Sequence, residues 1–250
     1  MLQVSQLTKR FGGFTAVSNV AFAVAEGEIL GLIGPNGSGK STTFNLIAGA
    51  YAPSAGSIRF RGEEIAGLAP ATVCHKGIAR TFQIPRPFRR LSVVENVAVA
   101  AYYGQTDKPS RAKAWEQAEE ALDLVGLRVR DARVEGLGAA GLKKLELARA
   151  LATQPQLLLA DESLGGLDEH EMEQVADMLA RIRAQRRITI IWVEHIMGVL
   201  MRVVDRCIVL DHGEKIAEGL PREVANDPKV VEVYLGADAA ALQAQMAARS

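Results

Sequence analysis

The stretch EILGLIGPNGSGKSTTFNLIAG, residues 28–49, decides the fold. Its first part, Glu28–Ile33, is an apolar and β-rich run that predicts a strand. Its last part, Thr42–Ala48, has helical composition and stops at Gly49. The loop between them has the spacing Gly-x-x-x-x-Gly-Lys-Ser, which between a strand and a helix is the pattern of a phosphate-binding loop. The segment therefore predicts a site for the phosphates of a nucleotide.

This loop, a Walker A motif, carries the residues that we expect to bind the nucleotide. They are Gly34, Pro35, Asn36, Gly37, Ser38, Gly39, Lys40, Ser41 and Thr42. Glycines lack a Cβ, so the backbone can wrap around phosphate oxygens and aim its N–H groups inward. The helix that follows points its N-terminus at the anion. We expect the Lys40 ammonium to reach the β- and γ-phosphates and the Ser41 hydroxyl to be a ligand of Mg²⁺.

A second acidic element ends the apolar run Gln156–Asp161. Such a run is typical of a strand that is buried on both faces of a parallel sheet. Alone, the pair Asp161-Glu162 would be an ordinary helix cap. After a Walker A loop, we expect Asp161 to hold Mg²⁺ through water, and Glu162 to orient and deprotonate the attacking water.

The rest of the chain predicts an α/β protein. Strand-like runs come early, at Leu2–Leu7, Val20–Val24, Ser57–Phe60 and Ile78–Phe82. From about 85 to 155 the pattern is helical, with capping-box spacing at Ser92 and one helix expected to bury Trp115. Strands and helices alternate in the last third, where Asp168 also has capping spacing. The Ala-rich tail, 237–250, has no obvious core face.

Composition narrows the function classes. The chain has 250 residues, 48% of them hydrophobic, which is ordinary globular usage. Lys+Arg and Asp+Glu each number 29, and the resulting net charge of zero argues against a general nucleic-acid binder. Cys74 and Cys207 are expected to be buried free thiols of a reducing compartment. No apolar run approaches the roughly 18 residues needed to span a bilayer, so we expect the chain not to cross a membrane.

Four further motifs keep the order and spacing of one family. They are Phe11, Thr81-Phe-Gln83, Ser163-Leu-Gly-Gly-Leu-Asp168 and Val193-Glu-His195. With the two motifs above, they make the chain resemble the ATP-binding subunit of ATP-binding-cassette (ABC) transporters along nearly its full length. The resemblance implies that Phe11 stacks on adenine and that Gln83 contacts Mg²⁺ and the attacking water. It also implies that His195 contacts the γ-phosphate and that Asp168 is the aspartate of the D-loop.

The signature loop is where the chain departs from that family. Members usually read Leu-Ser-Gly-Gly-Gln before a helix that ends Ala-Arg-Ala-Leu, and in the family this loop caps the ATP of the partner subunit. The intact helix sequence Leu142–Leu151 here follows the matching residues, which are Leu137, Gly138, Ala139, Ala140 and Gly141. Loss of the serine hydroxyl implies a cap weaker by about ten- to a hundredfold, while backbone N–H groups remain. Lys143 and Lys144 are expected on the exposed face of the helix.

Several runs resemble the ATPases of branched-chain amino acid importers in particular. They are Arg80–Phe88, Ser92–Asn96, Val193–His195, Gly213–Gly219 and Val233–Gly236. The resemblance implies ATP and Mg²⁺ as ligands and a second ATPase subunit, in a homo- or heterodimer. It further implies two transmembrane permease subunits, a periplasmic solute-binding protein, no nucleic acid, and a place at the cytoplasmic face of the membrane.

The same resemblance implies one ABC domain over 1–236. It would be a P-loop NTPase with a RecA-like, mainly parallel sheet, an antiparallel β subdomain and a helical subdomain inserted at about 85–155. Two other functions remain open: an ATP-gated clamp with little turnover, which the altered signature would suit, and a soluble ABC ATPase acting on nucleic acid or the ribosome. One basic stretch next to Gln83 either meets acidic residues or a coupling helix of the membrane subunit, or is a solvated face. It comprises Arg80, Arg86, Arg89 and Arg90.

Overall fold

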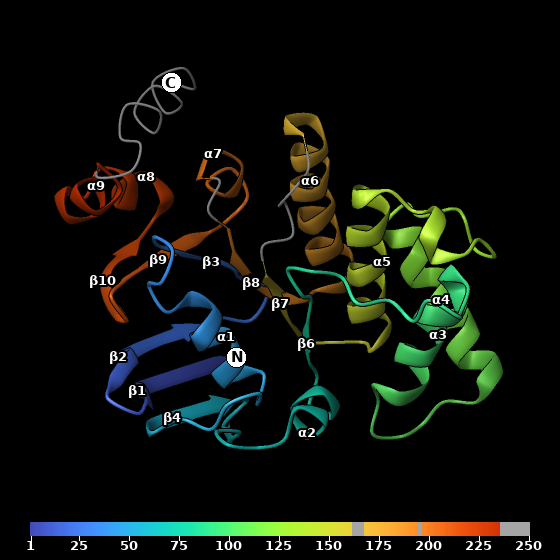
Figure 1. Ribbon diagram of the computed structural model, residues 1–250, viewed down its shortest axis with the longest axis horizontal. Helices are drawn as coiled ribbons and strands as arrows, with labels where there is room; N and C mark the ends of the chain where they lie inside the picture. The colour runs from blue at the N-terminus through green and yellow to red at the C-terminus, as the bar shows by residue number, and fades with distance from the viewer. Residues whose placement is uncertain (162–167, 195–196, 236–250) are drawn as a thin grey trace. The chain divides into compact units, whose positions relative to one another are not determined.

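The computed structural model describes residues 1–161, 168–194 and 197–235 (Figure 1). The chain divides into two compact units. The first unit comprises Met1–Leu68 and Thr189–Ser250, and the second comprises Ala69–Ile188. Within the described ranges, no helix is both long and apolar enough to span a membrane.

An antiparallel sheet forms one part of the first unit. Its strands, in the order β2-β1-β4-β5, are β1 (Leu2–Phe11), β2 (Phe14–Val24), β4 (Ala55–Phe60) and β5 (Glu63–Glu64). The buried residues Leu2, Val4 and Leu7 of β1 supply apolar side chains to the core of this unit. The strands that the sequence predicted here are confirmed, and β1 and β2 are longer than expected.

A second, mainly parallel group of strands carries the phosphate-binding loop. In the order β10-β9-β3-β8, they are β3 (Ile29–Ile33), β8 (Thr189–Val193), β9 (Arg206–Asp211) and β10 (Glu214–Gly219). Strand β3 is parallel to both β8 and β9, and all five of its residues are buried. The helices of this unit are α1 (Lys40–Ile47), α7 (Met197–Leu200), α8 (Pro221–Ala225) and α9 (Pro228–Leu235). Central burial explains why β3 is continuously apolar.

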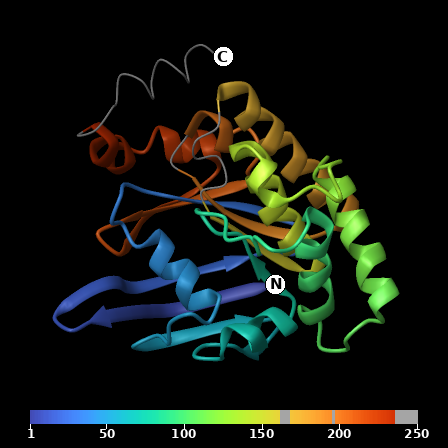
Figure 2. The same cartoon turned by 45° about the vertical axis from the view of Figure 1, so that its right-hand side comes forward.

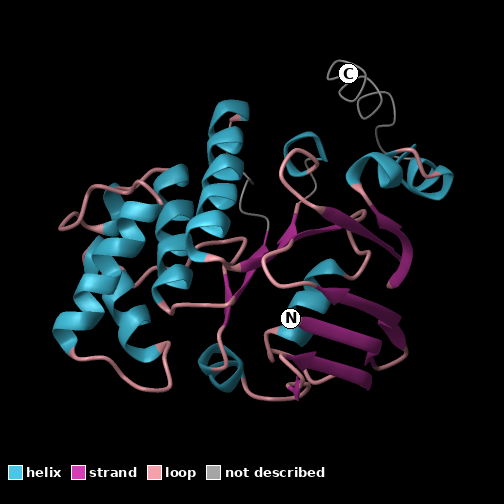
Figure 3. Ribbon diagram, turned by 180° about the vertical axis from the view of Figure 1, so that it is seen from behind, coloured by secondary structure: helices cyan, strands magenta, loops and turns pink. Residues whose placement is uncertain are grey.

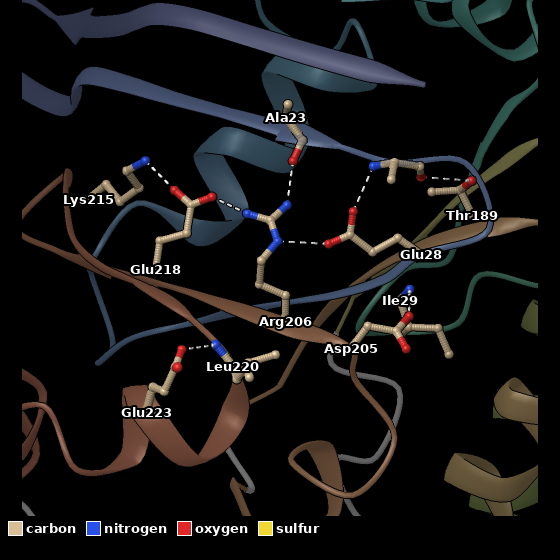
Figure 4. Close-up of polar contacts among 11 residues, drawn as sticks. Ala23, Glu28, Ile29, Thr189, Asp205, Arg206, Lys215, Glu218, Leu220 and Glu223 are labelled. Atoms are coloured by element: carbon tan, nitrogen blue, oxygen red, sulfur yellow. Dashed lines mark hydrogen bonds and ion pairs between the residues drawn. The ribbon is translucent and has the colours of Figure 1, made fainter.

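A polar network fixes the entry to β3 (Figure 4). The Arg206 guanidinium donates to three oxygens, those of Glu28, Ala23 and Glu218. Next to it, Asp205 Oδ2 accepts a hydrogen bond of 2.8 Å from the Ile29 amide. These contacts connect β3 to β2, β9 and β10 at the end opposite Gly34, so the phosphate-binding loop leaves a strand whose position is fixed.

The second unit is mostly helical. Its elements are α2 (Pro70–His75), β6 (Ile78–Arg80), α3 (Val93–Tyr103), α4 (Arg111–Leu124), η1 (Val134–Gly136), α5 (Ala139–Ala152), β7 (Leu157–Asp161) and α6 (Glu169–Arg186). Figures 2 and 3 show α3, α4 and α5 side by side. Strands β6 and β7 are parallel, and Arg80 lies opposite Leu159. Both expected capping boxes are present, at Ser92 and at Asp168.

Three local predictions need correction. Trp115 was expected in the core stripe of its helix, but 45% of it is exposed, because α4 packs through small residues such as Ala114, Ala118 and Ala121. Cys207 is buried as expected, whereas Cys74 is only half-buried. The predicted helix after the signature loop begins earlier, at Ala139, because alanine is a strong helix former.

Candidate functional site

The Walker A loop turns sharply between β3 and α1. Gly34, Gly37 and Gly39 all have positive φ, at 146°, 82° and 103°. A Cβ at Gly34 would lie 2.1 Å from the Leu210 carbonyl oxygen, and one at Gly39 would lie 2.7 Å from the Ala16 carbonyl oxygen. Only glycine fits both the backbone conformation and the space at these two positions.

Lys40, the first residue of α1, lies over this loop. The side chain is almost buried, and its ammonium donates to the carbonyl oxygens of Gly34 and Pro35, both at 2.8 Å. The ammonium therefore already lies within the loop that the sequence assigned to phosphates. Gly39 is the N-cap residue of α1. Because it has no side chain to accept hydrogen bonds from the first amides of the helix, those amides remain available to a ligand. A positive charge and a helix N-terminus are thus present in the same loop, which suits an anion.

The loop also presents an uncommitted hydroxyl. Ser41 is exposed, and among the described residues its side chain has no hydrogen-bond partner. By contrast, the neighbouring Thr43 hydroxyl donates to the Gly39 carbonyl at 3.0 Å and so stabilises the first turn of the helix. Ser41 therefore has the freedom that a metal-ligating oxygen needs.

Phe11 lies at the end of β1 with 42% of its surface exposed. Its ring packs edge-on against Tyr51, with 5.3 Å between the ring centroids. The Lys9 ammonium lies 5.0 Å from the Phe11 centroid and donates to the Ala52 carbonyl. An exposed ring held by two neighbours suits the predicted stacking on a base. The sequence did not suggest Tyr51 or Lys9, since neither has a distinctive spacing.

In the second unit, Asp161 is the last residue of β7. It is bound by Arg80, at the end of β6, and by Thr81, the next residue. The Asp161 amide donates to Thr81 Oγ1 at 3.1 Å, and Arg80 donates to Asp161 Oδ2 at 2.6 Å. The other carboxylate oxygen accepts no hydrogen bond from the described residues. Arg80 was assigned to a basic stretch that meets acidic residues or lies in solvent, and here it meets an acidic residue in the interior.

Gln83 is exposed in an irregular segment, residues 82–92, whose backbone groups bond to helix side chains. The Gln83 carbonyl accepts from Lys143 at 2.6 Å, and Arg149 donates to the Arg86 carbonyl at 3.0 Å. The buried Asn96 side chain accepts from the Phe88 amide at 2.7 Å and donates to the Phe88 carbonyl at 3.0 Å. Lys143, expected on the exposed face of its helix, is half-buried, and its side chain links α5 to this segment.

A buried acid supports the same segment. Burial raises the pKa of Glu146, while the Arg149 guanidinium, 2.9 Å away, acts in the opposite direction. The amides of Arg86 and Phe82 also favour the ionised form of this carboxylate. The α5 face that carries these side chains thus fixes the position of the loop around Gln83.

The signature residues begin α5. Gly138 is the N-cap of α5 and supplies no side-chain cap, while Ala139, Ala140 and Gly141 form the first helical turn. The loop therefore presents helix N-terminal amides without a hydroxyl. Asp168 is the N-cap of α6, where its side chain accepts from the Glu171 amide at 2.8 Å.

Two predicted catalytic residues, Glu162 and His195, lie outside the described residues. The first unit holds the Walker A loop and Phe11. The second unit holds Asp161, Gln83, the signature residues and Asp168.

Comparisons with known proteins agree with the resemblance to ABC transporter ATPases. A family profile described as ABC transporter matches residues 17–165, and one described as branched-chain amino acid ATP-binding cassette transporter matches residues 214–240. A high-affinity branched-chain amino acid transport ATP-binding protein of Pseudomonas aeruginosa is 37% identical, over 94% of this chain and 98% of its own length.

Solved structures show the same relationship. The cassette of an ABC transporter is 31% identical with a TM-score of 0.86, covering 94% of this chain and 98% of that one. A dimeric bacterial ABC transporter cassette is 27% identical with a TM-score of 0.80, covering 89% of this chain and 99% of that one. The predicted P-loop NTPase fold is thereby confirmed, and this chain belongs to the ATP-binding cassette family of ABC transporters, as an ATPase of that type.

Proposed function

We propose that this chain is the ATP-binding and ATP-hydrolysing subunit of an importer, and that it couples hydrolysis to the uptake of branched-chain amino acids or related small solutes. The glycine loop between β3 and α1, with Lys40 lying over it, carries the ATP chemistry. The solute class rests on the names of the relatives and on the profile matched at 214–240.

The nucleotide binds through the loop Gly34–Thr42. On binding, the Lys40 ammonium exchanges its two carbonyl partners for oxygens of the β- and γ-phosphates. Amides at the start of α1 donate to the same phosphates. Phe11 stacks on adenine, supported by Tyr51 and Lys9.

Ser41, Asp161 and Gln83 are the residues that we assign to Mg²⁺. This ion prefers hard oxygen ligands and is usually held by one or two protein oxygens together with phosphates and waters. The Ser41 hydroxyl and one Asp161 oxygen fit that need, because no described residue occupies them. When bound, Mg²⁺ neutralises charge on the phosphates.

Hydrolysis needs a base and a positioned water. We assign Glu162 as the general base that takes a proton from the attacking water. Gln83 orients that water, and His195 binds the γ-phosphate. The position of Gln83 follows from α5, because Lys143 holds its carbonyl.

A second ATPase subunit completes the site in this proposal. The residues Leu137–Gly141 contact the nucleotide bound to the partner subunit, through the first amides of α5 in place of a serine hydroxyl. A dimeric cassette among the similar solved structures supports this arrangement. Asp168 lies in the D-loop, next to the partner.

The membrane partners are two permease subunits, and a periplasmic solute-binding protein supplies the solute. The chain lies at the cytoplasmic face of the membrane. Its contact with the permease is the segment around Gln83, which exposes the apolar side chains of Phe82, Ile84 and Phe88. Exposed apolar side chains suit a contact with another protein, and hydrogen bonds from α5 side chains fix the backbone that carries them.

The test uses the chain purified with its membrane subunits and reconstituted in vesicles. We expect ATP-dependent uptake of radiolabelled leucine, isoleucine or valine, and we expect the Glu162→Gln variant to bind ATP but to lose both hydrolysis and uptake. Gly138, which has no hydroxyl where the family usually has a serine, favours one other function, an ATP-gated clamp with little turnover. Equal hydrolysis rates for wild type and Glu162→Gln would support the clamp, and purification with RNA instead of membrane proteins would contradict both functions.

A further inference from the structure

Arg80, which pairs with Asp161, has no role in the function proposed above. The guanidinium lies 2.6 Å from Asp161 Oδ2, and the side chains are only 13% and 6% exposed. Strand register places the two on one face, because Arg80 lies opposite Leu159 and Asp161 is two residues further along the same strand. The guanidinium also lies over the Phe82 ring, 5.2 Å from its centroid.

Burial makes the partner of Asp161 important. A carboxylate that is nearly removed from water needs a counter-charge, and removing one partner of a buried pair is strongly destabilising. Arginine stays protonated at every accessible pH, so its charge is permanent. Among the described residues, Arg80 is the cation in hydrogen-bond contact with this carboxylate.

A divalent metal would be a second cation at the same carboxylate. Two like charges that share one anion repel each other, and the repulsion is stronger in the interior than in water. The four negative charges of ATP offset this repulsion, whereas free Mg²⁺ in an empty site has no such compensation. The pair therefore disfavours the metal alone much more than the metal bound to ATP.

We propose that Arg80 is the resting counter-ion of Asp161 and prevents Mg²⁺ from binding there before the nucleotide. The proposal rests on the metal role assigned to Asp161 under the proposed function. Arg80 is in this view a positioning residue: it keeps the carboxylate fixed through Oδ2, leaves the other oxygen available, and makes metal binding conditional on ATP.

The variants Arg80→Gln and Arg80→Met remove the charge, and Met keeps an unbranched stem to pack over Phe82. Arg80→Lys keeps the charge. Arg89→Gln is the matched control, because Arg89 belongs to the same basic stretch but is exposed. The purified full chain is titrated with MgCl₂ in two series, one without nucleotide and one at a fixed concentration of a fluorescent ATP analogue. The readouts are Tm in the first series and analogue fluorescence in the second.

We expect MgCl₂ alone to raise the Tm of Arg80→Gln and Arg80→Met, but not the Tm of wild type, Arg80→Lys or Arg89→Gln. With the analogue present, the half-saturating Mg²⁺ concentration should fall by about tenfold or more in the two uncharged variants, since a neighbouring full charge changes ionic equilibria by that much. In an Asp161→Asn background, Arg80→Gln should have no effect on either readout.

Unchanged or weaker Mg²⁺ binding in Arg80→Gln and Arg80→Met, alongside normal binding in wild type, would overturn this inference and leave the proposed function intact. If wild type showed no Mg²⁺-dependent nucleotide binding at all, the proposed function would fail and this inference with it. A merely structural role for Arg80 would lower the Tm of the uncharged variants without changing their response to MgCl₂, and that result would also overturn the inference.

Discussion

Replacing Arg206 with Met should destabilise the first unit without touching the phosphate-binding loop. The Arg206 guanidinium contacts Glu28 at 2.9 Å and the Ala23 carbonyl at 2.6 Å, and it also contacts Glu218 (Figure 4). The Glu28 side chain is only 11% exposed, so the variant leaves a nearly buried carboxylate without this counter-charge.

The expected loss follows from burial. Breaking a fully buried pair costs about 3–5 kcal/mol, and the partial exposure of Arg206 reduces this to about 3 kcal/mol. At about 2–4 °C per kcal/mol for a chain of this size, Tm should fall by roughly 6–12 °C. Arg59→Met is the control, because its ion pair with Glu64 is long, at 3.6 Å, and exposed, so it should cost about 0–1 kcal/mol.

The assay is urea unfolding followed by circular dichroism, together with a thermal scan of each variant. ATP binding by the folded protein should be unchanged, since Arg206 contacts the entry to β3 and the loop begins at its other end. A loss for Arg206→Met no larger than that for Arg59→Met would refute the reasoning.

Three further predictions concern stability and nucleotide binding. Burial raises the pKa of Cys207 from 9.0 to about 12, so its contribution to stability is complete below pH 9 and is lost as pH rises toward 12, by up to about 4 kcal/mol. Between pH 9 and 12, the free energy of unfolding should decline less steeply for Cys207→Ala than for wild type. Parallel declines of the two proteins would contradict this. Phe11→Ala should weaken binding of a fluorescent ATP analogue by about tenfold through lost stacking, whereas Phe14→Ala, in the same hairpin, should not. Asn96→Ala should cost about 2–4 kcal/mol and speed hydrogen exchange at the Phe88 amide, because its buried side chain bonds both backbone groups of Phe88; unchanged exchange would argue against that role.

The elements that the sequence predicted well have local signals. The loop Gly34–Ser41 was recognisable because its glycines and lysine have a fixed spacing between a strand and a helix. The helix starts at Ser92 and Asp168 were predicted from capping spacing alone, and both boxes are present. Continuous apolar runs identified the buried strands β3 and β7, since strands covered on both faces do not alternate.

Contacts between distant residues could not be predicted in the same way. Arg80 meets Asp161 across 81 positions, and Lys143 reaches Gln83 across 60. Such pairs depend on strand register and helix packing, which hydrophobic periodicity does not specify. The prediction for Trp115 was wrong for a related reason. Helix α4 packs against its neighbours through small side chains such as Ala118, and the large Trp115 side chain stays exposed.

The most direct test of the account is the affinity of the purified chain for ATP in the presence of Mg²⁺, measured for wild type and for Lys40→Met. Lys40 is the nearly buried cation that contacts the loop carbonyls of Gly34 and Pro35. We predict Mg²⁺-dependent binding by wild type and a loss of about a hundredfold in the variant, as expected for removal of a charge-assisted bond to a multiply charged phosphate. Equal affinities for the two proteins, or no binding by either, would contradict the central claim that this loop binds the nucleotide's phosphates.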